Sequence, residues 1–74
     1  MSVALLQGFA REYLAGLPVR VYVNKRSRGF EVVASATRRK YFYVAWLPAK
    51  ATKRELAGAA DALRDEITKR ERIK

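Results

Sequence analysis

Residues 19–47 constrain the fold most, because apolar and polar side chains alternate there in three short runs. The runs read VRVYVN, FEVVASAT and YFYVAW, and the basic turns KRSRG and RRK separate them. Successive side chains of a β-strand point to opposite faces, so a period of two predicts strands with one apolar face. We therefore expect a three-stranded antiparallel sheet over residues 19–47, with Gly29 adopting a positive φ in the first turn.

The alternation also predicts which side chains face the core. In the first two runs the predicted core residues are Val19, Val21, Val23, Phe30, Val32, Ala34 and Ala36. In the third run we expect Phe42, Val44 and Trp46 to point inward. Tyr41 and Tyr43 are then expected to point outward.

Helical periodicity flanks the sheet on both sides. Residues 2–16 carry apolar side chains at helical spacing, with Ser2 as a cap and Gly16 as a stop. Residues 52–72 begin with TKRE, a capping box, and continue with leucine, alanine and isoleucine at helical spacing. The predicted fold class is α+β, in the order α-β-β-β-α, with the sheet packed on the C-terminal helix. We expect a single domain over residues 1–74.

The composition excludes several kinds of chemistry. The 74 residues include no cysteine and no histidine, so the usual nucleophile–base pairs and zinc sites cannot be assembled. The four glycines are scattered singly, which does not match a phosphate-binding loop. We therefore expect no enzymatic activity, no metal and no cofactor.

Membrane association is not expected either. No apolar run approaches the roughly 20 residues that a membrane span requires. The first residues, MSVALLQGFAREYLAG, lack the basic segment of a secretory signal. These features predict a cytoplasmic, intracellular protein, and they leave open a nucleoid protein or a virus-encoded one.

The distribution of charge is the strongest indication of a partner. Sixteen Lys and Arg against seven Asp and Glu give a formal net charge of +9. Residues 19–50 contain eight basic residues and one acidic residue, a net +7, whereas residues 51–74 contain seven basic and five acidic residues, a net +2. Such an excess repels itself unless a polyanion neutralises it.

We expect the outward face and the turns of the sheet to bind nucleic acid. Arginine suits phosphate and guanine, asparagine suits adenine, and tyrosine stacks on unpaired bases. The predicted nucleic-acid-binding residues are Arg20, Tyr22, Asn24, Lys25, Arg26, Arg28, Thr37, Arg38, Arg39, Lys40, Tyr41 and Tyr43. Basic residues also keep sheets soluble, but a face that serves only solubility usually mixes both signs of charge.

The stretches RGFEVVAS, RRKYFYVAWLP and TKRELAGAADALRDEI resemble a known family of DNA-binding domains. It is the arm-type DNA-binding domain of phage and transposon integrases, to which the plant ethylene-responsive-factor DNA-binding domain is related. The resemblance covers residues 19–68 and implies a sheet that enters the major groove of DNA. It also implies base and phosphate contacts from Arg20, Tyr22, Asn24, Arg39 and Tyr41. The predicted N-terminal helix is not part of that family's minimal pattern.

A second resemblance is to the double-stranded-RNA-binding domain, which has the same α-β-β-β-α order. LLQGFAREY is similar to its first helix, and Lys53 with Arg54 stands where that family binds RNA phosphates. Glu55 and Ala57 occupy places near which that family has further lysines. Because the sheet of that family binds no RNA, the resemblance leaves the +7 segment without a role.

The sequence therefore favours a small DNA-binding protein that uses the outer face and turns of its sheet. Two alternatives stay open. The first is an RNA-binding protein or a ribonucleoprotein component such as a ribosomal protein. The second is a basic adaptor or inhibitor that binds an acidic protein surface. A homodimer, if one forms, is expected through helix 2–16.

Overall fold

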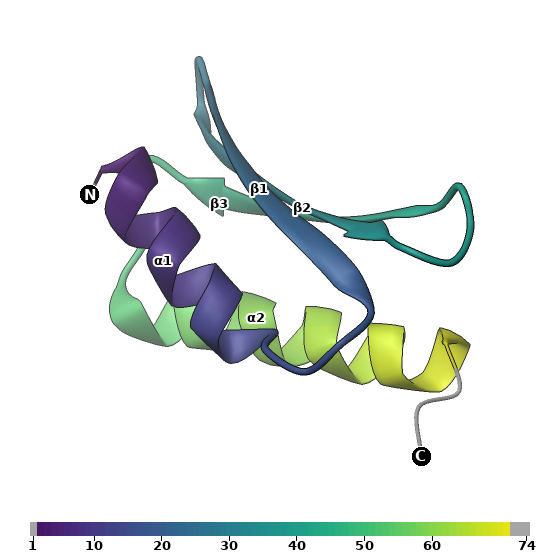
Figure 1. Ribbon diagram of the computed structural model, residues 1–74. Helices are drawn as coiled ribbons and strands as arrows, with labels where there is room; N and C mark the ends of the chain where they lie inside the picture. The colour runs from purple at the N-terminus through teal and green to yellow at the C-terminus, as the bar shows by residue number, and fades with distance from the viewer. Residues whose placement is uncertain (1, 72–74) are drawn as a thin grey trace.

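The computed structural model describes residues 2–71 and has the predicted order of elements (Figure 1). The chain runs through α1 (Val3–Tyr13), β1 (Val19–Arg26), β2 (Gly29–Ala36), β3 (Phe42–Pro48) and α2 (Lys53–Arg70). The α-β-β-β-α fold class is confirmed, with a three-stranded antiparallel sheet in contact with the C-terminal helix. Residue 1 and residues 72–74, at the two ends of the predicted domain, lie outside the described residues, as does the predicted helix end at residue 72.

Helix α1 begins where the Ser2 hydroxyl accepts a hydrogen bond from the backbone N–H of Leu5 at 3.2 Å. It ends at Tyr13, earlier than the predicted residue 16, because Leu14 caps it and Gly16, with a φ of 85°, turns the chain toward β1. The buried residues of this segment are Leu6, Ala10 and Leu14, whereas Leu5 lies on the outer side of the helix and is 71% exposed.

The structure describes a single copy of the protein, so the predicted homodimer through this helix stays a prediction.

Helix α2 has the capping box that the sequence predicts. The Thr52 hydroxyl accepts a hydrogen bond from the backbone N–H of Glu55 at 3.1 Å, and the Glu55 carboxylate accepts one from the backbone N–H of Thr52 at 3.2 Å. These two bonds satisfy donors that have no partner within the first turn of a helix. The buried face of α2 consists of Leu56, Ala60, Leu63 and Ile67.

The sheet has the strand order β1-β2-β3 and antiparallel pairing throughout. Gly29 begins β2 with a φ of 153°, which confirms the predicted positive φ. A Cβ atom at this position would overlap the backbone carbonyl group of Leu47, so glycine permits the close approach of β2 to β3.

Both helices lie on the same face of the sheet and make a two-layer molecule (Figure 1). Helix α1 contacts β1 and helix α2 contacts β3. The core lies between the two layers, and the opposite face of the sheet is left uncovered by either helix (Figure 1). The inward side chains of β1 and β2 are Val21, Val23, Phe30, Val32, Ala34 and Ala36, all buried as predicted, with Val19 partly buried.

Strand β3 is turned over relative to the prediction. Phe42, Val44 and Trp46 were expected in the core, but they are 64%, 44% and 64% exposed. Tyr43 was expected outside, but it is only 1% exposed, and Leu47 is buried beside it on the same face.

The pairing with β2 explains this orientation. Ala34 and Phe30 are buried, and their partners across the sheet are Tyr43 and Leu47. Directly opposed residues share a face, so the odd-numbered residues of β3 must point inward. Both sets of side chains in β3 are apolar or aromatic, and hydrophobic alternation alone therefore could not distinguish the two faces.

We predict that Leu63→Ala lowers the free energy of unfolding by about 2–5 kcal/mol, because it opens a cavity in the core between α2 and the sheet. Leu5→Ala, which truncates an exposed leucine on α1, is the matched control and should change it by about 0.5 kcal/mol or less. Urea titrations followed by circular dichroism measure both variants. Equal losses for the two would contradict the packing described here.

We further predict that Tyr43→Ala lowers the free energy of unfolding by about 3–5 kcal/mol, as expected for a buried aromatic side chain. Trp46→Ala should change it by about 0.5 kcal/mol or less, because Trp46 lies on the uncovered face. Trp46 is also the only tryptophan, so acrylamide should quench the protein's fluorescence efficiently. If acrylamide quenched the fluorescence poorly and Trp46→Ala strongly destabilised the protein, the result would instead support the orientation of β3 predicted from the sequence.

Candidate nucleic-acid interface

The uncovered face of the sheet, called here the outer face, is defined by the strand register. Directly opposed residues form four rows across this face of the sheet. The rows are Arg20–Ser35–Phe42, Tyr22–Val33–Val44, Asn24–Glu31–Trp46 and Arg26–Gly29–Pro48. Polar and charged side chains therefore occupy β1, while β3 contributes only apolar and aromatic ones.

The outer face exposes four large apolar or aromatic side chains to water. Phe42 and Trp46 are each 64% exposed, Tyr22 is 45% exposed and Val44 is 44% exposed. Single exposed apolar residues are common, but a contiguous group on one face marks an interaction surface. Sequence reasoning missed Phe42, Val44 and Trp46 as members of this surface, because it placed them in the core.

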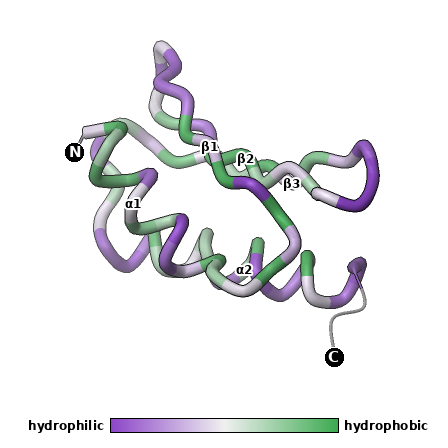
Figure 2. The backbone as a smooth tube through the Cα atoms, viewed as in Figure 1, coloured by the Kyte–Doolittle hydropathy of each residue, from purple (hydrophilic) through white to green (hydrophobic). Residues whose placement is uncertain are grey.

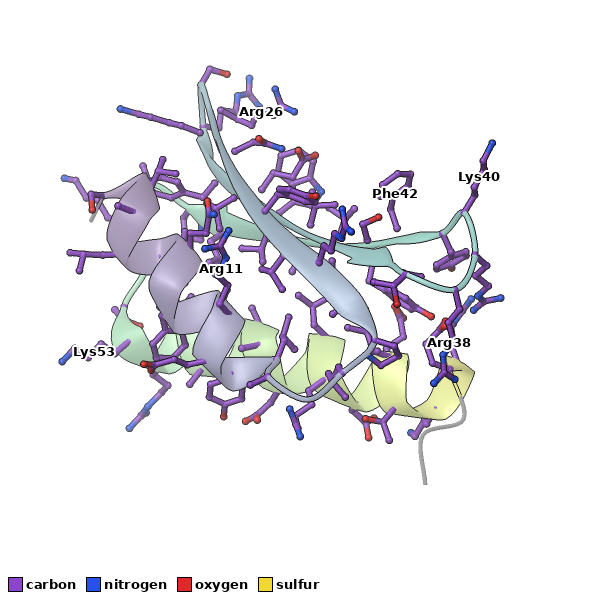
Figure 3. All side chains as sticks on the ribbon, viewed as in Figure 1. Arg11, Arg26, Arg38, Lys40, Phe42 and Lys53 are labelled. Carbon is purple, nitrogen blue, oxygen red and sulfur yellow. The ribbon has the colours of Figure 1, made fainter. Side chains whose placement is uncertain are left out.

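Basic turns lie at both ends of the outer face. Figure 2 shows the two turns of the sheet as hydrophilic segments that project from its opposite ends. In Figure 3, Arg26 lies near the tip of the β1–β2 hairpin, while Lys40 extends from the β2–β3 turn to the same side of the sheet as Phe42. Arg38 lies on the side of the turn nearer to α2 (Figure 3). The exposed basic residues of the sheet and its turns are Arg20, Lys25, Arg26, Arg28, Arg38, Arg39 and Lys40.

Glu31 is the only acidic residue of the sheet; two neighbours donate hydrogen bonds to it, and one of them, Arg26, also balances its charge. The Asn24 side-chain amide donates a hydrogen bond to Glu31 Oε1 at 3.0 Å, and Arg26 Nη2 donates to the same oxygen at 2.9 Å. These bonds, from Asn24 first and then Arg26, lower the pKa of Glu31 below its ordinary value. Asn24 and Arg26 thus lie on the predicted face, but each already has a partner within the protein.

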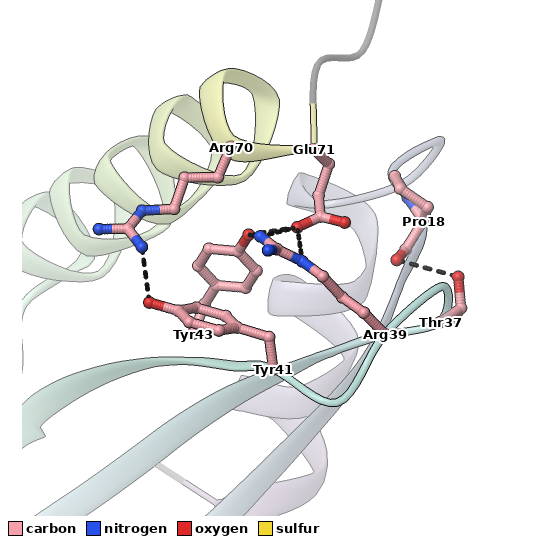
Figure 4. A network of polar contacts seen from close by, with 7 residues as sticks. All are labelled: Pro18, Thr37, Arg39, Tyr41, Tyr43, Arg70 and Glu71. Atoms are coloured by element: carbon pink, nitrogen blue, oxygen red, sulfur yellow. Dashed lines mark hydrogen bonds and ion pairs between the residues drawn. The ribbon is translucent and has the colours of Figure 1, made fainter.

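Arg39 takes part in a second cluster, on the helix side of the sheet (Figure 4). Its Nη2 and Nε atoms donate hydrogen bonds to Glu71 Oε2 at 2.8 and 3.1 Å. The Tyr43 hydroxyl donates to the same oxygen at 2.5 Å and accepts a hydrogen bond from Arg39 Nη2 at 3.3 Å. The cluster joins the β2–β3 turn to the C-terminal end of α2.

Tyr41 lies beside this cluster rather than on the outer face. Its hydroxyl accepts a hydrogen bond from Arg70 Nη1 at 2.8 Å (Figure 4). The guanidinium carbons of Arg39 and Arg70 lie 4.9 and 5.5 Å from the centre of its ring, within the range of cation–π attraction. The prediction that Tyr41 and Tyr43 point outward is therefore wrong, because their hydroxyl groups find charged partners at the end of α2.

The structure divides the predicted binding residues between two places. The outer face and its end turns hold Arg20, Tyr22, Asn24, Lys25, Arg26, Arg28 and Lys40. The Thr37 hydroxyl has its partner elsewhere. It donates a hydrogen bond to the carbonyl oxygen of Pro18 at 3.1 Å and so connects the end of β2 to the chain segment that precedes β1 (Figure 4). Arg39 and Tyr43 form the helix-side cluster with Glu71, Tyr41 lies beside it, and Arg38 lies on the side of the β2–β3 turn nearer to α2 (Figure 3).

Two hollows lie at opposite ends of the outer face. One, of about 310 Å³, is lined by Trp46, Arg26 and Arg28 together with Gly29, Leu47 and Pro48. The other, of about 270 Å³, is lined by Arg20, Tyr22, Ser35, Ala36 and Thr37. Each hollow combines an aromatic ring with at least one arginine, which is a pairing suited to a base and its phosphate.

The Glu71 cluster makes stability depend on pH. Hydrogen bonds from Tyr43 first and Arg39 second lower the pKa of Glu71, whose side chain is only 4% exposed. A lowered pKa in the folded state means that the ionised carboxylate stabilises the fold above the unfolded pKa of about 4.3. That contribution is lost as the pH falls through the lowered, folded-state pKa.

We therefore predict that Glu71→Gln lowers the melting temperature at pH 7 and that its difference from the wild type shrinks as the pH falls from about 5 to 3. Glu66→Gln, at an exposed glutamate of the same helix, is the matched control and should change the melting temperature little at any pH. Thermal unfolding by circular dichroism at several pH values tests this. If the difference in melting temperature between Glu71→Gln and the wild type stayed constant with pH, it would contradict a stabilising role of the ionised Glu71 carboxylate.

Comparison of the chain with protein families, with curated proteins and with solved structures finds no match in any of the three. The resemblances to the integrase arm-type and double-stranded-RNA-binding domains therefore stay expectations. Of the five residues to which the first resemblance assigns DNA contacts, Arg20, Tyr22 and Asn24 lie on the outer face, whereas Arg39 and Tyr41 do not. In the part of the chain that the structure describes, neither helix is long and apolar enough to cross a membrane.

Proposed function

We propose that this is a nucleic-acid-binding protein that binds DNA through the outer face of its sheet and the two turns at the ends of that face. The observation that carries the proposal is the location of both helices on one side, which leaves an aromatic and basic surface uncovered on the other. The proposal assigns phosphate contacts to the turns and base contacts to the face.

The electrostatics of the sheet support this function. Within residues 2–71, four basic residues of the outer face and its turns, Arg20, Lys25, Arg28 and Lys40, are exposed and take no part in an ion pair. The single acidic residue of the sheet, Glu31, already accepts hydrogen bonds from Asn24 and Arg26. The surface is therefore available to phosphates without a competing carboxylate, and such contacts release counterions and lose affinity steeply with salt.

The exposed aromatic residues argue against a role in solubility alone. A face that only keeps a protein soluble carries charges of both signs and avoids contiguous apolar patches. Here Phe42 and Trp46 lie exposed between basic turns. Aromatic rings among arginines and lysines are the side chains that contact bases and phosphates together.

Duplex RNA is the second candidate ligand. The α-β-β-β-α order agrees with the double-stranded-RNA-binding domain, and Lys53 and Arg54 are both exposed in the first turn of α2. An interface there would lie on the helix layer and would not involve the outer face. The two candidates therefore require different basic residues, which makes them separable by mutation.

We predict that Lys25→Gln/Arg28→Gln weakens DNA binding and makes the slope of log K against log salt shallower by about 1.8 on duplex DNA and about 1.4 on single strands, that is about 0.9 or 0.7 for each lost phosphate contact. Lys53→Gln/Arg54→Gln removes the same charge from the helix layer and should leave DNA binding nearly unchanged. Fluorescence anisotropy with duplex DNA, single-stranded DNA and duplex RNA, each over a salt series, measures these effects. Circular dichroism verifies that both variants fold.

The same titrations separate the alternatives. Tight binding to duplex RNA that depends on Lys53 and Arg54 would replace the DNA proposal with the RNA one. The absence of salt-dependent binding to all three polymers would rule out both. A basic adaptor that docks on an acidic protein would then be the remaining interpretation.

A further inference from the structure

We infer that the outer face binds an unpaired strand, with separate bases stacked on Trp46 and Phe42 and the phosphates held by Arg28 and Arg20. This inference rests on the proposed function and specifies the form of the nucleic acid. It assigns binding roles to two side chains, Phe42 and Trp46, that the sequence placed in the core.

The first subsite is the hollow at the β1–β2 end of the outer face. Trp46 forms its aromatic wall, and Arg26 and Arg28 form its basic side. Arg26 is held in place by its ion pair with Glu31 at 2.9 Å, yet its side chain is still 54% exposed. Arg28 has no ion pair within the described residues, so it can take a phosphate while a base lies on the indole ring.

The second subsite lies at the opposite end of the same face. Arg20, Ser35 and Phe42 are consecutive members of one row across the sheet. Arg20, Tyr22 and Ser35 line the hollow of about 270 Å³ there, and Phe42 stands on the far side of Ser35. The row thus provides a ring for a base, a hydroxyl group and a cation, in that order.

The spacing of the two rings favours an unpaired strand. Phe42 and Trp46 are separated by four positions on one strand, about 13 Å at a rise of roughly 3.3 Å per residue. Stacked bases in a duplex rise about 3.4 Å, and their faces are hidden by their neighbours. Two rings this far apart can each take the face of a base only if the bases are splayed from the stack, as in single strands.

A second copy of the protein is a less favourable occupant of this face. Face-to-face pairing of two outer faces would bring Arg20, Arg28 and the basic turns of both copies together. Like charges in a desolvated interface are strongly unfavourable. A nucleic acid strand instead covers the apolar rings with bases and neutralises the same arginines with phosphates.

The test compares a dye-labelled oligo(dT), an oligo(U) of equal length and a duplex DNA by fluorescence anisotropy. We expect the single strands to bind more tightly than the duplex. Phe42→Ala and Trp46→Ala should each weaken single-strand binding by about 5- to 150-fold, the effect of losing one stacked base. Trp46→Phe keeps a ring and should lose much less, and Leu5→Ala, at an exposed leucine of α1, is the control outside the face.

Trp46 offers an independent measurement, because the wild-type protein contains no other tryptophan. Stacking on a base should quench its fluorescence at saturating oligo(dT), and Phe42→Ala should shift the midpoint of that quenching without abolishing it. Unchanged tryptophan fluorescence at saturation would contradict a base on Trp46.

The outcomes separate this inference from the function on which it rests. Duplex binding that equals or exceeds single-strand binding, together with full affinity in both alanine variants, would overturn the inference and leave the proposed DNA binding intact. No salt-dependent binding to any of the polymers would overturn both. A preference for oligo(U) over oligo(dT) would support stacking of an unpaired strand but replace DNA with RNA as the ligand.

Discussion

Tyr43 lies under the sheet with 1% of its surface exposed, and its hydroxyl group donates a hydrogen bond to Glu71. A buried phenol needs such a partner, because an unsatisfied hydroxyl group in the core is costly. Arg39 balances the charge of Glu71, so one cluster joins β3, the β2–β3 turn and the end of α2. The cluster and the pairing with β2 require the same orientation of β3: with Tyr43 inward, Phe42, Val44 and Trp46 must point outward.

This arrangement leaves the isolated protein with two unfavourable features on one face. The outer face and its turns carry Arg20, Lys25, Arg26, Arg28 and Lys40 against Glu31 alone, an excess of positive charge that repels itself, and the same face exposes Phe42 and Trp46 to water. A partner that covers only the rings leaves the charge, and a partner that only neutralises the charge leaves the rings exposed. A nucleic acid strand addresses both, because it offers phosphates and base faces at repeated intervals.

The sequence predicted the fold where polar and apolar residues alternate clearly, and its predictions for the site were less complete. In β1, Arg20, Tyr22 and Asn24 lie between valines, so the outer face of that strand could be assigned correctly. In β3, YFYVAWLP is apolar or aromatic at nearly every position, and a shift by one residue exchanges the faces. The pairing with β2 and the contact of Tyr43 with Glu71, 28 residues later, both favour the observed orientation, and local patterning cannot detect partners so distant in sequence. The amphipathic character of tyrosine was the one available signal, since a phenol can enter a core when a charged partner is near.

The acidic residues determine which arginines can bind a ligand. Arg26 is paired with Glu31 and Arg39 with Glu71, and each pair fixes one end of the sheet: the β1–β2 hairpin and the β2–β3 turn. Arg20 and Arg28 have no such pair within residues 2–71, although they stand near the same two ends. The side chains of Arg26 and Arg39 are therefore already positioned by carboxylates, and Arg26 lies with Trp46 in the hollow at the β1–β2 end. A ligand on the outer face has to order Arg20 and Arg28 on binding but not Arg26, and this partial preorganisation favours affinity.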